Sequence, residues 1–408
     1  MAAWAPQAAS RRDRFYVSPL NFAPEVTAHE RFAPRVQIHD VTIREGEQAA
    51  DLAFTVDERV ELAQAIAASG ISQLQVGYAG DDDETVRALK RAGVPARVAV
   101  LGVAWKPNWQ RAQATARDAG VDVLQVLVRS ADRQLANLGL SRDGALRLLD
   151  DAVSHAVRLG FPVVMFDPSF STTADWDHLL RMYAVAADAG AQRLAVVDSM
   201  GVAKPSVIAY MTREVRRRFG LPVTVHCHDD FGLVVANTVA GAVEGAEWLD
   251  ASFLGVGERA GNCPLEELVL ALEGLYGVGT GLRTEQLAGV TELVSRLGRT
   301  PIWPSKAVVG ANSFAQKLDM HVKAAATDPS LMEPYDPTLV GNRRAIKLGR
   351  GSGPAAVGAK LAELGLELPP DLISEAVRLV NERATAAKAS LSDDDIRRLV
   401  RELGDSGE

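Results

Sequence analysis

The sequence contains only two cysteines, Cys227 and Cys263, in 408 residues. So few cysteines cannot form the disulfide framework of a small secreted protein, and they favour a reducing compartment. No apolar run reaches the ~18 residues needed to span a bilayer. The first residues also lack the roughly 7–15-residue apolar core of a signal peptide. We therefore expect a cytoplasmic protein with no membrane partner.

Basic residues are not in excess either. The chain has 44 Lys and Arg against 52 Asp and Glu, which gives a formal net charge of −8. A nucleic-acid partner would require a basic patch that neutralises phosphates, so this balance argues against one. Hydrophobic residues make up 47% of the chain and charged residues 24%, which is typical of a globular protein that buries a large core.

From Val36 to about Gly277, short β-branched apolar segments alternate with amphipathic segments of helical period. Eight segments fit strands, at residues 36–43, 71–78, 96–103, 121–128, 162–167, 193–199, 223–228 and 248–254. Apolar strands that alternate with helices indicate a parallel sheet covered on both faces. Eight such units in about 240 residues predict a (β/α)8 TIM barrel. A doubly wound open sheet is the alternative, but it usually has fewer strands.

The remainder of the chain divides more loosely. We expect an N-terminal extension over residues 1–35, a catalytic barrel over 36–283, a linker or lid over 284–353 and a helical C-terminal subdomain over 354–408. The segment 300–353 contains proline and glycine and is expected to be irregular. In the last subdomain, Ser390 or Ser392 is expected to cap a helix whose first turn is acidic.

The seventh expected strand ends in two histidines. His226 and His228 are two residues apart and therefore face the same side of the strand. In a barrel of this type the loops that follow the strands meet at one mouth, where the chemistry takes place. Two adjacent imidazoles are costly to bury unless they are bonded, and a divalent metal satisfies both. A hydrogen-bonded pair of core histidines is the alternative; we favour the metal.

Two further polar segments follow strand ends. The first strand continues into a dense polar run from His39 to Gln48, and a carboxylate there could complete a site of two histidines and one carboxylate. By itself this run also fits a solvated, charged loop. The eighth strand leads into the glycine-rich segment 255–262, which lacks the Gly-Lys-Ser/Thr ending of a phosphate-binding P-loop.

Taken together, these segments resemble the acetyl-CoA-dependent acyltransferase branch of the DRE-TIM metallolyase superfamily. This branch includes homocitrate synthase, 2-isopropylmalate synthase and citramalate synthase. Its signature D-x-T-x-R-[DE]-G-E-Q is matched from Asp40 to Gln48, H-x-H-[ND]-D-x-G-x-x-x-A-N from His226 to Asn237, and G-x-G-E-R-x-G-N from Gly255 to Asn262. Residues 314–321 and 333–341 also resemble family segments. Glutamate at position 45 is closest to the homocitrate synthases.

The resemblance implies a metal-dependent Claisen-type condensation of acetyl-CoA with a 2-oxo acid, which gives a 2-hydroxy-2-carboxymethyl acid. It implies that Glu45, His226 and His228 bind a divalent Mg, Mn or Zn ion. Arg44 would stabilise the developing alkoxide. His321, assisted by Glu258, would remove a proton from the acetyl methyl group. Because His321 lies outside the barrel, the resemblance suggests that it reaches a site across a homodimer interface.

Some positions depart from the family pattern. Gln75 replaces a glutamate that is usual in the second strand, so it keeps hydrogen bonding but loses the charge that would pair with Arg44. In homocitrate synthases an arginine after strand five contacts the distal carboxylate of 2-oxoglutarate, and our alignment places Thr173 there. Arg129 or Arg133 could replace that arginine. We therefore expect a different substrate, for example oxaloacetate or phosphonopyruvate. The candidate substrate contacts are Gln48, Gln75, Arg133, Thr173 and Ser199, with Asn262 and Tyr335 as additional candidates.

Two other functions remain open from the sequence. One is a retro-Claisen or aldol lyase on the same scaffold, in which Cys263 would take part. The other is a non-catalytic metal-binding barrel, for which the replacement at Gln75 is the only support.

Overall fold

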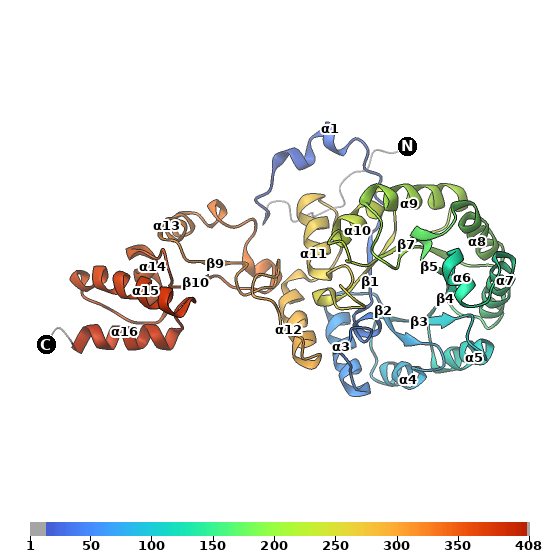
Figure 1. Ribbon diagram of the computed structural model, residues 1–408, viewed down its shortest axis with the longest axis horizontal. Helices are drawn as coiled ribbons and strands as arrows, with labels where there is room; N and C mark the ends of the chain where they lie inside the picture. The colour runs from blue at the N-terminus through green and yellow to red at the C-terminus, as the bar shows by residue number, and fades with distance from the viewer. Residues whose placement is uncertain (1–13, 406–408) are drawn as a thin grey trace. The chain divides into compact units, whose positions relative to one another are not determined.

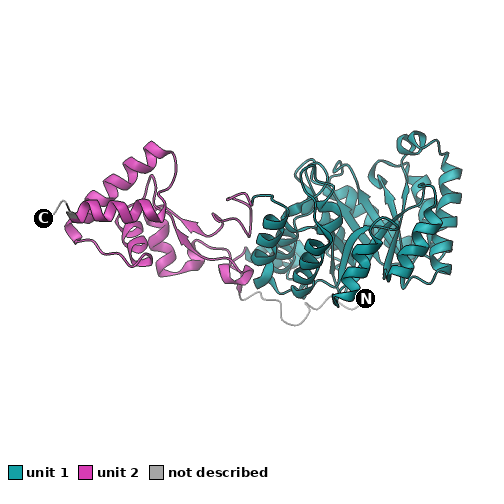
Figure 2. Ribbon diagram, turned by 90° about the horizontal axis from the view of Figure 1, so that it is seen from below, with its two compact units in different colours: residues 1–12, 18–301 teal, residues 13–17, 302–408 magenta. Residues whose placement is uncertain are grey.

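The computed structural model describes residues 14–405, so the expected N-terminal extension falls partly outside the described residues. The described chain forms two compact units (Figure 2). Unit 1 comprises residues 18–301, and unit 2 comprises residues 14–17 together with 302–405. Within the described residues, no helix combines the length and the apolarity needed to cross a bilayer.

Unit 1 contains a closed barrel of eight parallel strands, as predicted (Figure 1). The strands follow one another around the barrel in chain order, and β1 pairs with both β2 and β8, which closes it. Their bounds are β1 (Gln37–Asp40), β2 (Gln73–Tyr78), β3 (Arg97–Val103), β4 (Val123–Arg129), β5 (Val163–Ser169), β6 (Arg193–Asp198), β7 (Val223–Cys227) and β8 (Trp248–Ala251).

The first strand is shorter than expected. It ends at Asp40, and the residues that follow form the short helix α2 (Thr42–Gly46). The Asp40 carboxylate accepts hydrogen bonds from the backbone N of Thr42 at 3.0 Å and from its hydroxyl at 2.7 Å. This local bonding turns the chain away from the strand direction. As a result, Arg44 and Glu45 lie at the start of a helix at the barrel mouth.

Helices surround the barrel, and several begin at side chains that cap their first turn. Thr55 and Glu58 form a capping box at the start of α3, and Ser141 and Asp175 cap α7 and α8. The helices of unit 1 after α2 are α3 (Val56–Ala68), α4 (Asp83–Arg91), α5 (Trp109–Ala119), α6 (Asp132–Asn137), α7 (Arg142–Arg158), α8 (Trp176–Asp188), α9 (Pro205–Phe219), α10 (Val234–Val243), α11 (Leu265–Leu270) and α12 (Leu287–Leu297). The short helix α1 (Pro24–Thr27) precedes the barrel.

Unit 2 has its own apolar core, formed by α13 (Asp319–Thr327), α14 (Pro354–Glu363), α15 (Ile373–Ala387) and α16 (Asp393–Asp405) beside a parallel strand pair, β9 (Ala315–Gln316) and β10 (Ala345–Ile346). The expectation that residues 300–353 are irregular throughout is wrong, because α13 forms there. Tertiary contacts stabilise it: Val322 is buried in the core, and Asp319 accepts hydrogen bonds from the backbone of α14. Ser392, rather than Ser390, caps α16. The domain boundaries at 283 and 353 stay predictions.

Candidate active site

A cavity of about 290 Å³ opens where the barrel strands end. Seven of the predicted site residues line it: Arg44, Glu45, Gln48, Ser199, His226, His228 and Glu258. They lie at or just after the ends of β1, β6, β7 and β8, and therefore in regions far apart in the chain. The barrel brings them together because all its strands are parallel and end at the same side.

Glu45, His226 and His228 form the centre of this cavity. All three side chains are buried, and their ligand atoms lie within 4.8 Å of one another. The Nε2 atom of His226 lies 3.2 Å from the Nε2 atom of His228 and 3.7 Å from a carboxylate oxygen of Glu45. Burial lowers the pKa of His228 to about 4, so its imidazole is neutral near pH 7. Two imidazole nitrogens and one carboxylate converge as a divalent ion requires.

Asp250, within β8, orients the His226 ring through a hydrogen bond on the side of the ring away from Nε2. One carboxylate oxygen lies 3.0 Å from Nδ1 of His226, and the other lies 3.0 Å from Nδ1 of His39. Burial opposes its ionisation, but the two histidines hold the pKa of Asp250 well below its usual range. A hydrogen bond to Nδ1 leaves Nε2 of His226 free to face the cavity.

Arg44 is buried at the cavity wall, and neighbouring side chains fix its orientation. Its Nε donates to the Gln75 amide oxygen at 2.5 Å, its Nη1 donates to Gln48 at 3.2 Å, and it forms an ion pair with Glu45. Gln75 in turn donates to Gln125, a buried residue of β4. Burial disfavours the charge on Arg44, but Glu45 raises its pKa overall. Gln75 therefore keeps the hydrogen-bonding role expected of it.

The glycine-rich loop after β8 supports Glu45 from the other side. Asn262 donates from its amide nitrogen to Glu45 at 3.4 Å. A Cβ atom at position 257 would fall on that amide group, so Gly257 is required for its position. Gly261 has a positive φ of 96° and also packs against the backbone of Gly255.

Comparison with known proteins agrees with this geometry. The HMGL-like family model matches residues 35–294, and the homocitrate synthase post-HMGL domain-like model matches residues 308–403. The chain belongs to the HMGL-like family. Its relatives there identify it as an enzyme of the homocitrate and isopropylmalate synthase type, an acyltransferase.

Relatives in the family are similar over most of the chain. Homocitrate synthase AksA of Methanopyrus kandleri is 33% identical over 377 residues, which cover 91% of this chain and 94% of the relative. A probable 2-isopropylmalate synthase of Ignicoccus hospitalis is 35% identical over 381 residues, covering 92% and 94%. A putative (R)-citramalate synthase CimA of Archaeoglobus fulgidus is 31% identical over 371 residues, covering 90% and 75%.

Solved structures support the barrel fold alone. The HMG-CoA lyase of Bacillus subtilis superimposes with a TM-score of 0.59 at 20% identity, covering 67% of this chain and 97% of that structure.

The two other functions left open by the sequence are not favoured, because the relatives are synthases. In addition, Cys263 is fully buried, and burial raises the pKa of its thiol to about 12, which leaves it unreactive.

Not every predicted substrate contact of this HMGL-like chain lies at the cavity. Arg133, on α6, and Thr173 are exposed and do not line it; the Thr173 hydroxyl donates to the Phe170 carbonyl at 3.1 Å. His321 lies on α13, and Tyr335 packs against Phe15 and Phe314, all within unit 2. Gln75 and Asn262, two further predicted contacts, do not line the cavity either and instead hydrogen-bond to Arg44 and Glu45. The roles of all the predicted site residues stay predictions.

Other cavity residues were not among the predicted site residues. Asp167, at the inner face of β5, is buried, and burial raises its pKa to about 6. Trp105 and Tyr78 also line the cavity, as does Arg129, which was one of two arginines considered for the substrate tail. A signal for Asp250 was present: it is the single charged residue of the segment that forms β8.

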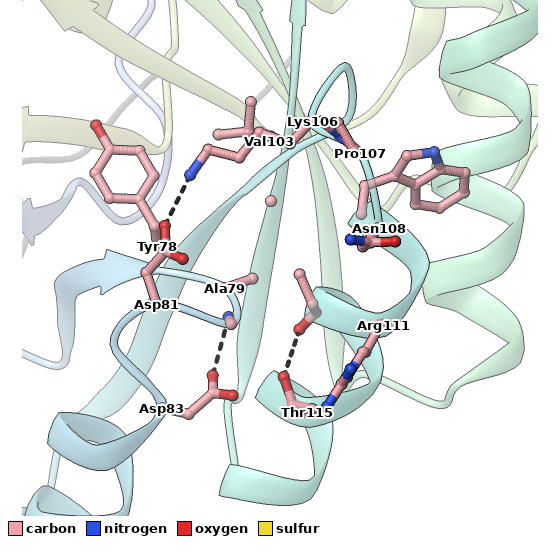
Figure 3. A pocket seen from close by; sticks show the side chains of 14 residues that line it. Tyr78, Ala79, Asp81, Asp83, Val103, Lys106, Pro107, Asn108, Arg111 and Thr115 are labelled. Carbon is pink, nitrogen blue, oxygen red and sulfur yellow. Dashed lines mark hydrogen bonds and ion pairs between the residues drawn. The ribbon is translucent and has the colours of Figure 1, made fainter.

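A second cavity, of about 370 Å³, lies between the loops that follow β2 and β3. Figure 3 shows Lys106 reaching Asp81, with Arg111 and Asn108 on the other wall. Lys106 and Asp81 pair at 2.7 Å, so their charges largely cancel. Tyr78 lines both cavities, but none of the predicted site residues lines this one.

Proposed function

We propose that this chain catalyses the condensation of acetyl-CoA with a 2-oxo acid to give a 2-hydroxy-2-carboxymethyl acid. The observation that carries the proposal is the convergence of Glu45, His226, His228 and Arg44 in one cavity at the barrel mouth. The names of the relatives, which are homocitrate, 2-isopropylmalate and citramalate synthases, support the same reaction class.

Glu45, His226 and His228 would hold a divalent ion, for which Mg, Mn and Zn are the candidates. The donor set fits such an ion, because the ligand atoms of two imidazoles and one carboxylate all lie within 4.8 Å of one another. When bound, the ion would polarise the 2-carbonyl group of the oxo acid as a Lewis acid. Asp250 keeps the His226 ring in the orientation and tautomer that this role needs.

Arg44 would stabilise the negative charge that develops on the former carbonyl oxygen. Its guanidinium group is held by Gln75 and Gln48 and so needs little reorganisation when the charge appears. Because this charge is complete only near the transition state, the interaction accelerates the reaction more than it strengthens substrate binding. Gln75 acts as a positioning residue for Arg44.

Removal of a proton from the acetyl methyl group would generate the enolate that attacks the carbonyl carbon. Glu258 is exposed at the rim of the cavity, where it can meet the thioester. We propose that it assists His321 as the base, with His321 supplied by the second subunit of a homodimer. Hydrolysis of the thioester by water then releases CoA and makes the condensation irreversible. We place this reaction in the cytoplasm.

The test is release of free CoA from acetyl-CoA with a panel of 2-oxo acids and with Mg, Mn or Zn. The panel contains oxaloacetate, 2-oxoglutarate, pyruvate, 2-oxoisovalerate and phosphonopyruvate. We expect oxo-acid-dependent CoA release that a chelator abolishes and added metal restores. Absence of release with every acid and metal would refute the proposed function. The mass of the complex in solution, with and without a His321→Ala substitution, tests the dimer separately.

A further inference from the structure

Two polar side chains at adjacent strand ends line the active-site cavity without a partner. Arg129 ends β4 and Ser169 ends β5, and the two residues are paired in register across the parallel strands. Both line the cavity. Among residues 14–405, neither Nε of Arg129 nor Oγ of Ser169 has a hydrogen-bond partner, although both atoms are buried. Buried polar atoms rarely lack a hydrogen-bond partner, so we expect these two atoms to bind a polar group of a ligand.

The charge of Arg129 is also uncompensated. No ion pair within the described residues involves it, whereas Arg44 and Arg259 in the same cavity are paired with Glu45 and Asp230. Its guanidinium group instead lies 5.1 Å from the Trp105 ring centre and 5.8 Å from that of Phe170. Aromatic faces restrain an arginine and favour its charge without neutralising it. Arg129 therefore presents to the cavity a positive charge that is restrained by two aromatic rings and has no ion-pair partner among the described residues.

Hydrogen bonds hold the surrounding backbone. The carbonyl of Ser169 accepts hydrogen bonds from Ser130, from its backbone N at 3.2 Å and its hydroxyl at 2.9 Å. The next residue, Phe170, has a positive φ of 64° and donates its N–H to Ser199 at 2.8 Å. A bulky residue in this left-handed conformation is uncommon, and such strain is found most often at functional sites. In this conformation the Phe170 ring lies beside the Arg129 guanidinium group.

We propose that Arg129 and Ser169 form the subsite for the tail of the 2-oxo acid, and that this tail carries an anionic group, a carboxylate or a phosphonate. The inference rests on the proposed function, and it selects Arg129 over Arg133 and Thr173. Arg129 donates a charge-assisted hydrogen bond to the anion and Ser169 a neutral one. A branched apolar tail would leave both atoms buried and unpaired, which disfavours it.

The test compares oxaloacetate, 2-oxoglutarate and phosphonopyruvate with 4-methyl-2-oxopentanoate, which has the shape of oxaloacetate but a neutral tail. We expect wild-type enzyme to favour at least one anionic tail in kcat/KM. Arg129→Gln should lower that value roughly 10- to 100-fold, and Ser169→Ala roughly 2- to 10-fold, because they remove a charged and a neutral hydrogen bond. Neither substitution should change kcat/KM for 4-methyl-2-oxopentanoate by more than about threefold. Arg147→Gln, an exposed arginine on α7, is the matched control.

Calorimetric binding of the same acids to metal-loaded protein, without acetyl-CoA, separates this inference from the proposed reaction. Loss of anion binding in Arg129→Gln, with binding retained in Arg147→Gln, supports the subsite even if no CoA is released. The inference is overturned if wild-type protein prefers the neutral acid in both assays. It is also overturned if Arg129→Gln keeps the anion preference, or if Arg133→Gln abolishes that preference in its place. In those cases CoA release by the wild type would leave the proposed reaction standing.

Discussion

Replacing Asp250 by asparagine should weaken metal binding although Asp250 does not line the cavity. Its carboxylate now accepts from Nδ1 of both His226 and His39, each at 3.0 Å. An amide of the same shape has one accepting oxygen and one donating NH2 group, so one of the two imidazoles must present a bare Nδ1 and carry its proton on Nε2. When that imidazole is His226, the proton occupies the position that the metal needs.

The expected size of the effect follows from similar partners of metal-bound histidines. Loss of such a partner typically reduces metal affinity 10- to 100-fold, which is about 1.4 to 2.7 kcal/mol. We would measure free Mn²⁺ by electron paramagnetic resonance during titration of wild-type protein and of Asp250→Asn. Thermal unfolding of the same samples shows that the variant is folded.

A matched control is the same change at the other end of the barrel. Asp122 precedes β4 and accepts from the backbone N of Val98 at 2.8 Å and from Lys90 at 2.6 Å, away from the mouth. Asp122→Asn should bind Mn²⁺ like the wild type. If folded Asp250→Asn also binds Mn²⁺ within about twofold of the wild type, the orienting role assigned to Asp250 is wrong.

Three further predictions concern single residues. Glu45→Gln should abolish both Mn²⁺ binding and CoA release, because an amide is a much weaker ligand than a carboxylate; retained release without bound metal would contradict the site. Cys263→Ser should keep full CoA release, and iodoacetamide should not label Cys263 in the native protein. The reason is that the thiol is buried and burial raises its pKa to about 12. Labelling of Cys263, or loss of activity in the variant, would instead favour the lyase function. Burial raises the pKa of Asp40 to about 7 from an ordinary value of 3.8, so the folded protein binds this proton more tightly than the unfolded chain does. Stability relative to Asp40→Asn should therefore be greatest below pH ~4 and fall by up to a few kcal/mol as the pH rises to about 7. Melting curves of both proteins across this range check it, and parallel curves would contradict it.

The barrel and the convergence of the two histidines with a carboxylate could be predicted, because they follow from local patterns together with the family resemblance that singled out Glu45. Alternation of apolar strands with helices indicates the parallel barrel, and the spacing of His226 and His228 places both on one face of a strand. The order of strands around a barrel then brings Glu45, after β1, close to β7. None of these steps requires knowledge of a tertiary distance.

The substrate tail could not be placed in this way. Arg129 and Arg133 are four residues apart in the sequence, and their surroundings differ only in the fold. Arg129 is still part of β4 and faces the cavity, whereas Arg133 lies on α6 and is exposed. Asp250 was overlooked for a similar reason. Its orienting role depends on contacts with Nδ1 of His39 and of His226, which lie on two other strands. Both cases depend on how strand ends meet, which a single sequence does not report.

The order of the strands separates two kinds of change that evolution or an engineer could make. Glu45, Arg44 and the histidines follow β1 and β7, while Arg129 and Ser169 end β4 and β5, with β6 between them and β7. Substitutions at positions 129 and 169 touch none of the hydrogen bonds that hold His226 or Arg44. A library varied only at positions 129 and 169 could therefore be screened for new 2-oxo acids while the hydrogen bonds around His226 and Arg44 stay unchanged.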